Sequence, residues 1–390
     1  MSVLEKIIKI INILIRLPFK VIKKIYRVIR SILRIPSRII NKIKREIANY
    51  KKKKYYTEQV YKACDEIKKC NSKDYIVLFN PTWLGVANST KGLFENNVPL
   101  EQVFGNKNIK LIANTIIEND IKAVIFSQLV DGWTEVIKEI KKEKPEIIIK
   151  VIWHANNGEV LSDYTWLINK ELIKLYDVGL IDAFAFVKKS MTEFYNKVGY
   201  KSFYLINNVK SKEESYTYNY TKNKKLKIGI YNASSREIKN IYTQLTAIKL
   251  LDNASADIVP SYKGVIDFLD ILHLDYTHLE EYIPTEKLME RIKDNDVNVY
   301  ITFTECSPMF PIESFESGVP CLVGNNNDYF QNTELGNYII VNREDDAEFI
   351  KDKIIECIEN REKIMQLYKT WKMQFDIQCI ENVKAFIEIN

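Results

Sequence analysis

The chain has 390 residues, of which 46% are apolar and 28% are charged, so it can bury more than one hydrophobic core and is not a disordered polypeptide. Its net charge of +6 is uneven, because residues 1–54 contain seventeen Lys and Arg and two Glu. That segment carries +15, which leaves −9 for the remaining 336 residues. The basic character therefore belongs to one segment, and the body of the chain is mildly acidic.

The cysteines and the apolar runs exclude two further classes of protein. The six cysteines are scattered, with no CxxC pair and no nearby His, so the common zinc sites are not expected and a reduced, cytoplasmic chain is. The longest early apolar run, residues 10–15, is too short for a signal core or a bilayer span.

Residues 1–54 are predicted to form basic amphipathic helices that lie on a membrane surface. From Val21 onward, apolar residues recur every three to four positions with Lys and Arg between them, which is the pattern of a two-faced helix. Pro18 and Pro36 are expected to divide the segment, and residues 51–54, all Lys, to form a hinge. Such a helix binds anionic headgroups, so we expect a peripheral location on the cytoplasmic face of the membrane.

Two other interpretations of the basic segment are weaker. An ordinary helix packed on its own protein or on a partner would show the same periodicity. Nucleic acid is not expected as a partner, because the segment lacks the aromatic and Gly-rich elements that read bases.

Residues 55–210 are predicted to form a first α/β domain. Short apolar runs at 75–79, 109–111, 123–126, 147–153, 183–187 and 202–206 indicate buried strands, and residues 133–142 and 191–197 between them have helical periodicity. This alternation predicts a doubly wound parallel sheet.

A polar linker, residues 211–225, separates the first domain from a second one predicted at residues 226–370. Strands are expected there at 226–230, 256–259, 297–303, 321–323 and 338–341. Residues 371–390 are expected to form a C-terminal helix that packs back on the first domain. Because open α/β sheets bind ligands beyond the carboxyl ends of their strands, a cleft between the domains is the expected active site.

The passage with the most chemical information follows the strand at 297–303. Glu305 lies in a loop, Glu313 follows near the start of a short helix, and a Gly318-Val-Pro320 turn comes after it. A loop that enters a helix offers free N–H groups to a diphosphate, and a carboxylate there can accept hydrogen bonds from ribose hydroxyls. Two glutamates alone are more often an acidic surface turn.

This passage resembles the donor-binding signature of the retaining glycosyltransferases of family four, which have the GT-B fold. Glu305, Glu313, Gly318 and Pro320 match its spacing, and supporting likeness extends over residues 75–390. The resemblance implies two Rossmann-like domains, a nucleotide-diphosphate sugar as co-substrate, and neither a cofactor nor a metal. In this family the first glutamate is usually followed by Gly-Phe-Gly, whereas this chain has Cys306-Ser307-Pro308.

By position, the resemblance implies that Glu313 binds the nucleotide ribose and that Glu305 lies beside the donor sugar as a catalytic candidate. Ser307, Met309 and Phe310, between the two glutamates, are further donor-binding candidates. The family also places Arg and Lys after the first strand of the second domain, where charge on the leaving diphosphate needs stabilisation. Here those candidates are Arg236 and Lys239, although solvated charges on a helix would give the same pattern.

The first domain supplies three more candidates. Gly85 and Asn88 follow its first strand, where the family has a loop that approaches donor and acceptor, and Gly85 permits close backbone approach. His154 follows the strand at 147–153 and is a catalytic candidate for contact with a donor-sugar hydroxyl, although a single His is more often structural.

The resemblance implies a retaining, metal-independent glycosyltransferase, and the predicted membrane helix suggests a lipid-linked or cell-surface glycan as its acceptor. The alternative is a catalytically silent GT-B-like module that binds a glycan or a partner at the membrane, as the Cys306-Ser307-Pro308 departure allows. A GT-B epimerase would need additional acid and base residues, and a phosphorylase would need a site for a lysine-bound cofactor.

Overall fold

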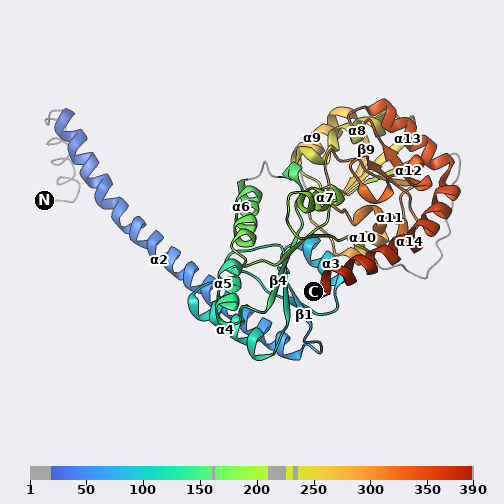
Figure 1. The fold of residues 1–390 in the computed structure, drawn as a ribbon. Coiled ribbons are helices and arrows are strands. Elements are labelled where there is room, and N and C mark those ends of the chain that lie inside the picture. Colours follow the sequence, from blue (N-terminus) through green and yellow to red (C-terminus); the bar gives the residue numbers. More distant parts are fainter. Residues whose placement is uncertain (1–18, 160–162, 210–224, 232–235, 389–390) are drawn as a thin grey trace. The chain divides into compact units, whose positions relative to one another are not determined.

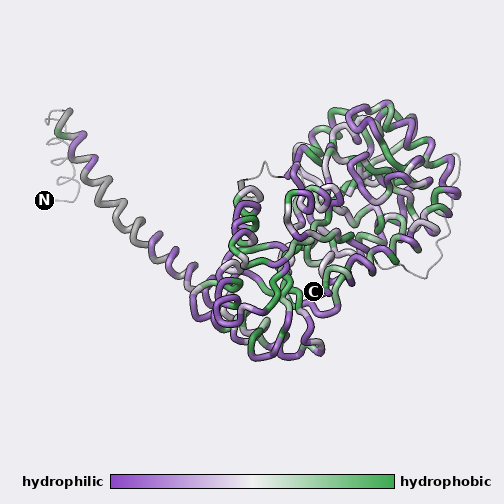
Figure 2. The backbone as a smooth tube through the Cα atoms, in the orientation of Figure 1, coloured by the Kyte–Doolittle hydropathy of each residue, from purple (hydrophilic) through white to green (hydrophobic). Residues whose placement is uncertain are grey.

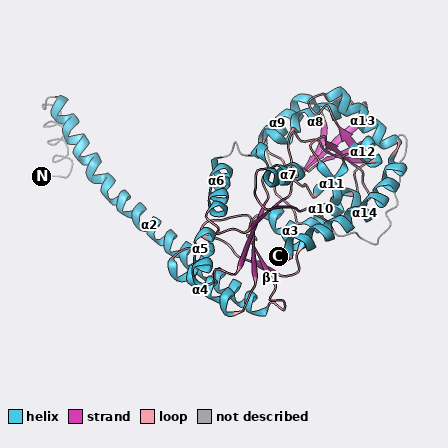
Figure 3. Cartoon of the chain, viewed as in Figure 1, coloured by secondary structure: helices cyan, strands magenta, loops and turns pink. Residues whose placement is uncertain are grey.

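The computed structural model describes residues 19–159, 163–209, 225–231 and 236–388. The chain divides into two units, residues 1–61 and residues 62–390. Residues 210–224, which include all of the predicted linker (211–225) except its last residue, lie outside the described residues. Figure 3 shows helices and strands alternating through the second unit, as the sequence pattern predicts.

Within residues 19–69 a single helix, α2 (Phe19–Lys69), is found, whereas the expected division at Pro18 and the residues before it lie outside the described residues. The predicted break at Pro36 is wrong, because the fixed φ of proline fits a helix and its cost is limited to one lost hydrogen bond and local crowding. Residues 51–54 lie within α2 and form no hinge, so the helix continues past the predicted boundary at residue 54. No helix among the described residues is both long and apolar enough to cross a membrane.

The first sheet has six parallel strands in the order β2-β1-β3-β4-β5-β6. They are β1 (Tyr75–Phe79), β2 (Asn97–Pro99), β3 (Ala123–Ser127), β4 (Ile148–Trp153), β5 (Ala183–Phe186) and β6 (Ser202–Tyr204). The helices between them are α3 (Leu84–Leu93), α4 (Asn106–Glu118), α5 (Trp133–Glu143), α6 (Asp163–Asp177) and α7 (Lys189–Lys197), with a 3₁₀ turn η1 (Asn157–Glu159). The central strands are rich in Val and Ile and almost wholly buried, as expected for a sheet covered on both faces (Figure 2).

The strand predicted at residues 109–111 is wrong, because these residues lie inside α4. Their apolar run belongs to a longer helical period, since Ile112, Ala113 and Ile116 are buried on the same helix. The edge strand β2 has only three residues and no apolar run, and was not predicted.

The second sheet also has six parallel strands, in the order β12-β11-β10-β7-β8-β9. They are β7 (Leu226–Ile230), β8 (Ala254–Ile258), β9 (Asp275–His278), β10 (Val297–Tyr300), β11 (Cys321–Gly324) and β12 (Ile340–Val341). The connecting elements are η2 (Glu237–Lys239), α8 (Ile241–Lys249), α9 (Lys263–Leu272), α10 (Thr285–Ile292), α11 (Phe310–Glu316), η3 (Asp328–Phe330), α12 (Glu334–Ile339) and α13 (Ala347–Glu359).

The last helix, α14 (Arg361–Ile387), extends from the second domain to the first (Figure 1). Its start packs in the second core through Ile364, while Phe386 near its end is buried in a cluster with Val77 and Ile125 of the first sheet. The Nζ of the buried Lys150 donates to the carbonyl of Glu388, 2.8 Å away, and to the carbonyl of Phe386. Apolar burial and these two hydrogen bonds therefore hold the end of α14 on the first domain.

Candidate active site

Each sheet contains one point where the strand order reverses, and every candidate residue except His154 follows a strand on one side of such a point. In the second sheet β7 and β10 are neighbours, with β8 beside β7 and β11 beside β10. In the first sheet the reversal lies between β1 and β3. Ligands of doubly wound sheets bind beyond the carboxyl ends of the strands at such points, so these two edges are the physical candidates for binding.

Lys239 and Glu305 meet at the carboxyl edge of the second sheet. Lys239, in η2 after β7, donates from Nζ to a carboxylate oxygen of Glu305, which follows β10. Tyr300, the last residue of β10, donates its hydroxyl to the same oxygen at 2.9 Å and accepts from Lys239 Nζ at 3.1 Å. Burial, followed by the Glu305 charge, raises the pKa of Tyr300 well above its ordinary value, so the phenol stays a neutral donor.

Glu313 has a different environment. It lies in the first turn of α11 and is only 8% exposed. No hydrogen bond to its carboxylate is found within the described residues, and burial alone raises the pKa of this carboxyl to about 7. A carboxyl that is buried without a partner is costly unless a ligand supplies the missing donors. Glu313 is therefore the candidate residue whose surroundings are least complete in the described structure.

Helix α11 itself has only seven residues, with Pro311 in its first turn, so it offers few backbone donors. Positive charge for a diphosphate must then come from side chains. Arg236 supplies one candidate and immediately follows residues 232–235, which lie outside the described residues. Its guanidinium forms an ion pair with Glu159 of η1 at 2.8 Å, so this cation is already paired with a carboxylate of the first domain.

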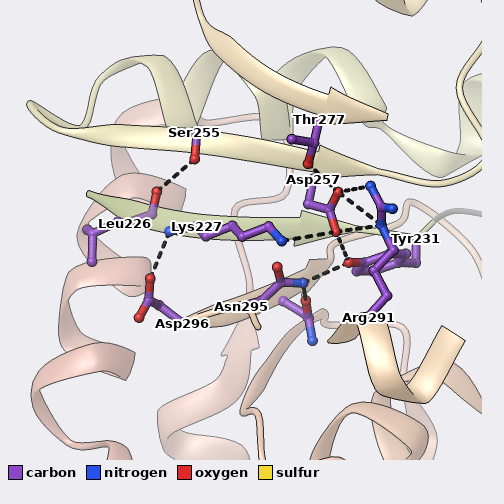
Figure 4. Close-up of polar contacts among 10 residues, drawn as sticks. Leu226, Lys227, Tyr231, Ser255, Asp257, Thr277, Arg291, Asn295 and Asp296 are labelled. Carbon is purple, nitrogen blue, oxygen red and sulfur yellow. Dashed lines mark hydrogen bonds and ion pairs between the residues drawn. The ribbon is translucent and has the colours of Figure 1, made fainter. Parts of the chain in front are cut away.

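A buried polar network fixes the end of β7, immediately before this loop (Figure 4). Asp257 of β8 is fully buried, and its two carboxylate oxygens share the single N–H of Arg291 Nε at 2.9 and 3.1 Å, while Oδ1 also accepts from Arg291 Nη2. Tyr231 donates its hydroxyl to Asp257 and accepts from Asn295 Nδ2 at 2.8 Å. The Tyr231 ring packs against Phe310 of α11, with 5.3 Å between centroids, so the network also supports the helix that carries Glu313.

The other candidates from the passage between the glutamates have internal contacts. Ser307 is 5% exposed; its Oγ accepts from Asn207 N at 3.0 Å, and its carbonyl accepts from Asn207 Nδ2 at 2.8 Å. Phe310 is buried between the rings of Tyr231 and Tyr300. Met309 is the partly exposed N-cap of α11. The geometry thus gives Ser307 an interdomain role and Phe310 a packing role.

In the first domain, Gly85 and Asn88 lie in α3 rather than in an open loop. A Cβ at Gly85 would meet no atom within 4 Å, so nothing in the described structure requires a glycine there. The side chain of Asn88 is exposed and donates to Thr285 Oγ1 of α10 at 3.4 Å, a contact between the domains.

His154 directly follows β4, and its Nε2 lies 2.8 Å from Ser127 Oγ at the end of β3. Its backbone N–H donates to Gln128 Oε1 at 3.1 Å. Burial lowers the pKa of His154 to about 4, so the imidazole is neutral at physiological pH.

The sequence did not indicate Glu159, Ser127, Tyr300 or Asn207. The only available signal was position, since Ser127 directly follows the strand predicted at 123–126, Tyr300 lies within the strand predicted at 297–303, and Glu159 follows His154 closely. A cavity of about 850 Å³ along α6, lined by residues such as Trp153, Trp166, Lys170 and Tyr195, contains none of the candidate residues. No cluster of three or more His, Cys, Asp or Glu suited to a metal ion is found within the described parts of the chain.

Comparisons with known proteins show the fold. No protein-family model matches the sequence, and no curated protein matches it. Solved structures do match: a trehalose-6-phosphate synthase (OtsA) at 10% identity and a TM-score of 0.55, covering 80% of this chain and 98% of its own. The trehalose-6-phosphate synthase from E. coli bound with UDP-2-fluoro glucose matches at 10% identity and a TM-score of 0.54, covering 80% of this chain and 98% of its own.

The sucrose-phosphate synthase from Thermosynechococcus elongatus matches at 10% identity and a TM-score of 0.54, covering 80% of this chain and 95% of its own. The chain thus has the two-domain GT-B fold of these glycosyltransferases, as predicted. At this identity the likeness defines the fold alone. Membership of family four is not confirmed, since these neighbours are named as synthases of trehalose 6-phosphate and sucrose phosphate.

Proposed function

We propose that this protein is a retaining glycosyltransferase that moves a sugar from a nucleoside diphosphate to an acceptor hydroxyl. The observation that carries the proposal is Glu313, a buried carboxylate without a described partner, at the sheet edge where doubly wound folds bind nucleotides. Ribose hydroxyls would supply the hydrogen-bond donors that this carboxylate lacks. The GT-B fold supports the same proposal, because the structural neighbours carry the names of sugar-phosphate synthases.

In this proposal Arg236 and Lys239 stabilise the charge that develops on the leaving diphosphate. When the donor binds, Arg236 and Lys239 would then exchange their present partners, Glu159 and Glu305, for the diphosphate. Glu305 lies within reach of the donor sugar, and Gly85 and Asn88 border the acceptor. Front-face attack, with a diphosphate oxygen taking the acceptor proton, requires no nucleophile of the enzyme. Orientation in a closed cleft then accounts for most of the rate enhancement.

A thermal-shift screen followed by a turnover assay tests the proposal. One neighbour was solved bound with UDP-2-fluoro glucose, so UDP-glucose and UDP-galactose are the first donors to test, with GDP-mannose and ADP-glucose as alternatives. A donor that binds only the folded state raises the melting temperature, and turnover releases the nucleoside diphosphate when membrane extract or a sugar phosphate is added. The two acceptor arms separate a lipid-linked or surface glycan from a soluble sugar phosphate.

Binding to an anionic membrane surface through residues 1–50 is part of the proposal. Lys23, Lys24 and Arg27 are exposed on α2, and each basic residue near an anionic surface contributes about 1 kcal/mol. A protein that lacks residues 1–50 is expected to bind the nucleotide sugar as the full chain does and to stop sedimenting with phosphatidylserine vesicles. Sedimentation that is unchanged by the deletion would remove the membrane proposal and leave the transferase proposal standing.

A catalytically silent module is the second candidate, and the contacts of residues 306–308 favour it. Cys306 Sγ lies 3.8 Å from Glu159, Ser307 binds Asn207, and the Pro308 carbonyl accepts from Tyr329, so the loop that would embrace a donor is bonded internally. A nucleotide sugar that binds without hydrolysis or transfer in either acceptor arm would select this candidate.

A further inference from the structure

Two buried hydroxyl side chains, Thr90 and Ser127, and the partly buried His154 form a hydrogen-bonded row at the carboxyl edge of the first sheet, beside the point where the strand order reverses. Thr90 of α3 and Ser127 at the end of β3 have their hydroxyl oxygens 2.7 Å apart. Ser127 Oγ lies 2.8 Å from His154 Nε2, and Thr90 Oγ1 lies 2.8 Å from the carbonyl oxygen of Val86. Thr90 is 0% and Ser127 1% exposed, so solvent does not compete for these bonds.

Counting protons gives the row a single direction. A carbonyl oxygen can only accept, so the one proton of the Thr90 hydroxyl is donated to Val86. Thr90 must therefore accept from Ser127, which uses the only proton of Ser127. Ser127 Oγ in turn can only accept from the imidazole, so the proton of a neutral ring lies on Nε2.

From this arrangement we infer that Thr90 and Ser127 are positioning residues that hold His154 as its Nε2–H tautomer, so that Nδ1 presents a hydrogen-bond acceptor to the ligand. The backbone of His154 is also restrained, since its N–H donates to the side chain of Gln128, which has a left-handed φ of 70°. No contact of Nδ1 is found among the described residues. The low pKa of His154, about 4, agrees with a ring that stays neutral.

The part of the inference that concerns the ligand rests on the proposed function and narrows its substrate class. An acceptor nitrogen pairs with a hydroxyl group, which can donate, and opposes a carboxylate, which can only accept. A site built in this way selects a neutral sugar hydroxyl over the carboxylate of a uronic acid.

The tautomer can be measured without any activity. The chain has only three histidines, His154, His273 and His278, so long-range ¹H–¹⁵N spectra of the ring nitrogens resolve each one, and His154→Gln assigns the relevant signals. At pH 7 the full chain is expected to show a protonated Nε2 and an unprotonated Nδ1 for His154. A protonated Nδ1, or a charged ring, would overturn the inference.

Two threonine variants test the direction of the row. Thr90→Val keeps the shape of the side chain but removes the oxygen that accepts from Ser127. The Ser127 hydroxyl can then donate to Nε2 of His154 instead. The Nδ1–H form of His154 should therefore become the major tautomer. Thr115→Val is the matched control, because Thr115 of α4 is also buried and makes the same bond to the carbonyl four residues earlier, at 2.8 Å from Leu111. Its His154 signals should be unchanged, and an unchanged tautomer in a folded Thr90→Val protein would contradict the inference.

Binding of UDP-glucose and UDP-glucuronic acid tests the ligand part. The full chain is expected to bind UDP-glucose about 10-fold or more tightly than UDP-glucuronic acid, because a site built to pair with a hydroxyl group discriminates against a ligand that leaves its polar group unpaired. Thr90→Val is expected to lose most of this preference. Equal binding of both sugars with the expected tautomer would refute selectivity alone. If neither sugar binds, the proposed function and the selectivity fail together, whereas the tautomer remains measured independently by the spectra.

Discussion

The raised pKa of Glu313 predicts how the stability of the protein depends on pH. The folded-state value of about 7, against an ordinary value of 4.5, means that the folded protein holds this proton more tightly than the unfolded chain. Stability is therefore greatest below pH 4.5 for this group and falls as the pH rises through 7. A difference of about 2.5 pKa units corresponds to roughly 3 kcal/mol, at about 1.4 kcal/mol per unit.

Glu313→Gln removes this titration, and urea unfolding at pH 5 and pH 8 measures the difference. The variant should resemble the wild type at pH 5 and be more stable at pH 8, by up to roughly 3 kcal/mol. Glu316→Gln is the matched control, because Glu316 lies on the same helix and is equally buried, but accepts a hydrogen bond from Tyr368 at 2.7 Å. If Glu313→Gln shows the same pH dependence as the wild type, the reasoning about this carboxyl is refuted.

The same carboxyl links donor binding to pH. If only the ionised form accepts from ribose hydroxyls, the apparent affinity for UDP-glucose should be about 10-fold weaker at pH 6 than at pH 8, because most of the group is protonated at the lower pH. Isothermal titration in two buffers of different ionisation enthalpy should also detect release of a proton on binding at pH 6.5. Affinity that does not change between pH 6 and pH 8 would contradict the assignment of Glu313 to the ribose.

Three further substitutions probe the remaining parts of the site. Gly85→Ala should leave the melting temperature unchanged or slightly raised, because Ala is the better helix former by about 1 kcal/mol. The same variant should lower turnover at least 10-fold if a substrate approaches this backbone. The control is Gly264→Ala, also at the second position of a helix, which should leave turnover unchanged. Glu159→Gln releases Arg236 from its ion pair and should tighten UDP-glucose binding several-fold in calorimetry, whereas weaker binding would assign Glu159 a direct role in holding the donor. Asp257→Asn leaves the Arg291 charge with a weaker partner and should destabilise the second domain by about 3 kcal/mol in urea unfolding, and a loss below 1 kcal/mol would mean that the network of Figure 4 is not structural.

The sequence predicted most of the fold because most of its strands are apolar and several are rich in β-branched residues. β1 and β3 are nearly continuous runs of this kind, and β4 is one apart from Lys150; a strand buried on both faces of a sheet needs such a run. β9 was missed because its residues alternate between exposed and partly buried positions at the edge of the sheet and include Asp275 and His278. Pro36 misled the prediction because the rule for proline is statistical, and a long helix can continue through one.

From the sequence, only the position of each candidate residue relative to a strand could be predicted, and not which side chains pair with one another. Lys239 follows β7 and Glu305 follows β10, and these two strands are neighbours in the sheet. The sequence alone does not reveal which strands are neighbours. The ion pair of Arg236 with Glu159 and the row from Thr90 to His154 depend on distances between segments far apart in the sequence. Side-chain pairing of this kind follows from the register of the sheet and the packing of the domains, and no local pattern encodes it.

A crystal structure with UDP-glucose tests the central claim most directly. The account predicts both ribose hydroxyls within hydrogen-bond distance of the Glu313 carboxylate and the diphosphate beside Arg236 and Lys239. A nucleotide bound elsewhere, with Glu313 still buried and unpartnered, would contradict it.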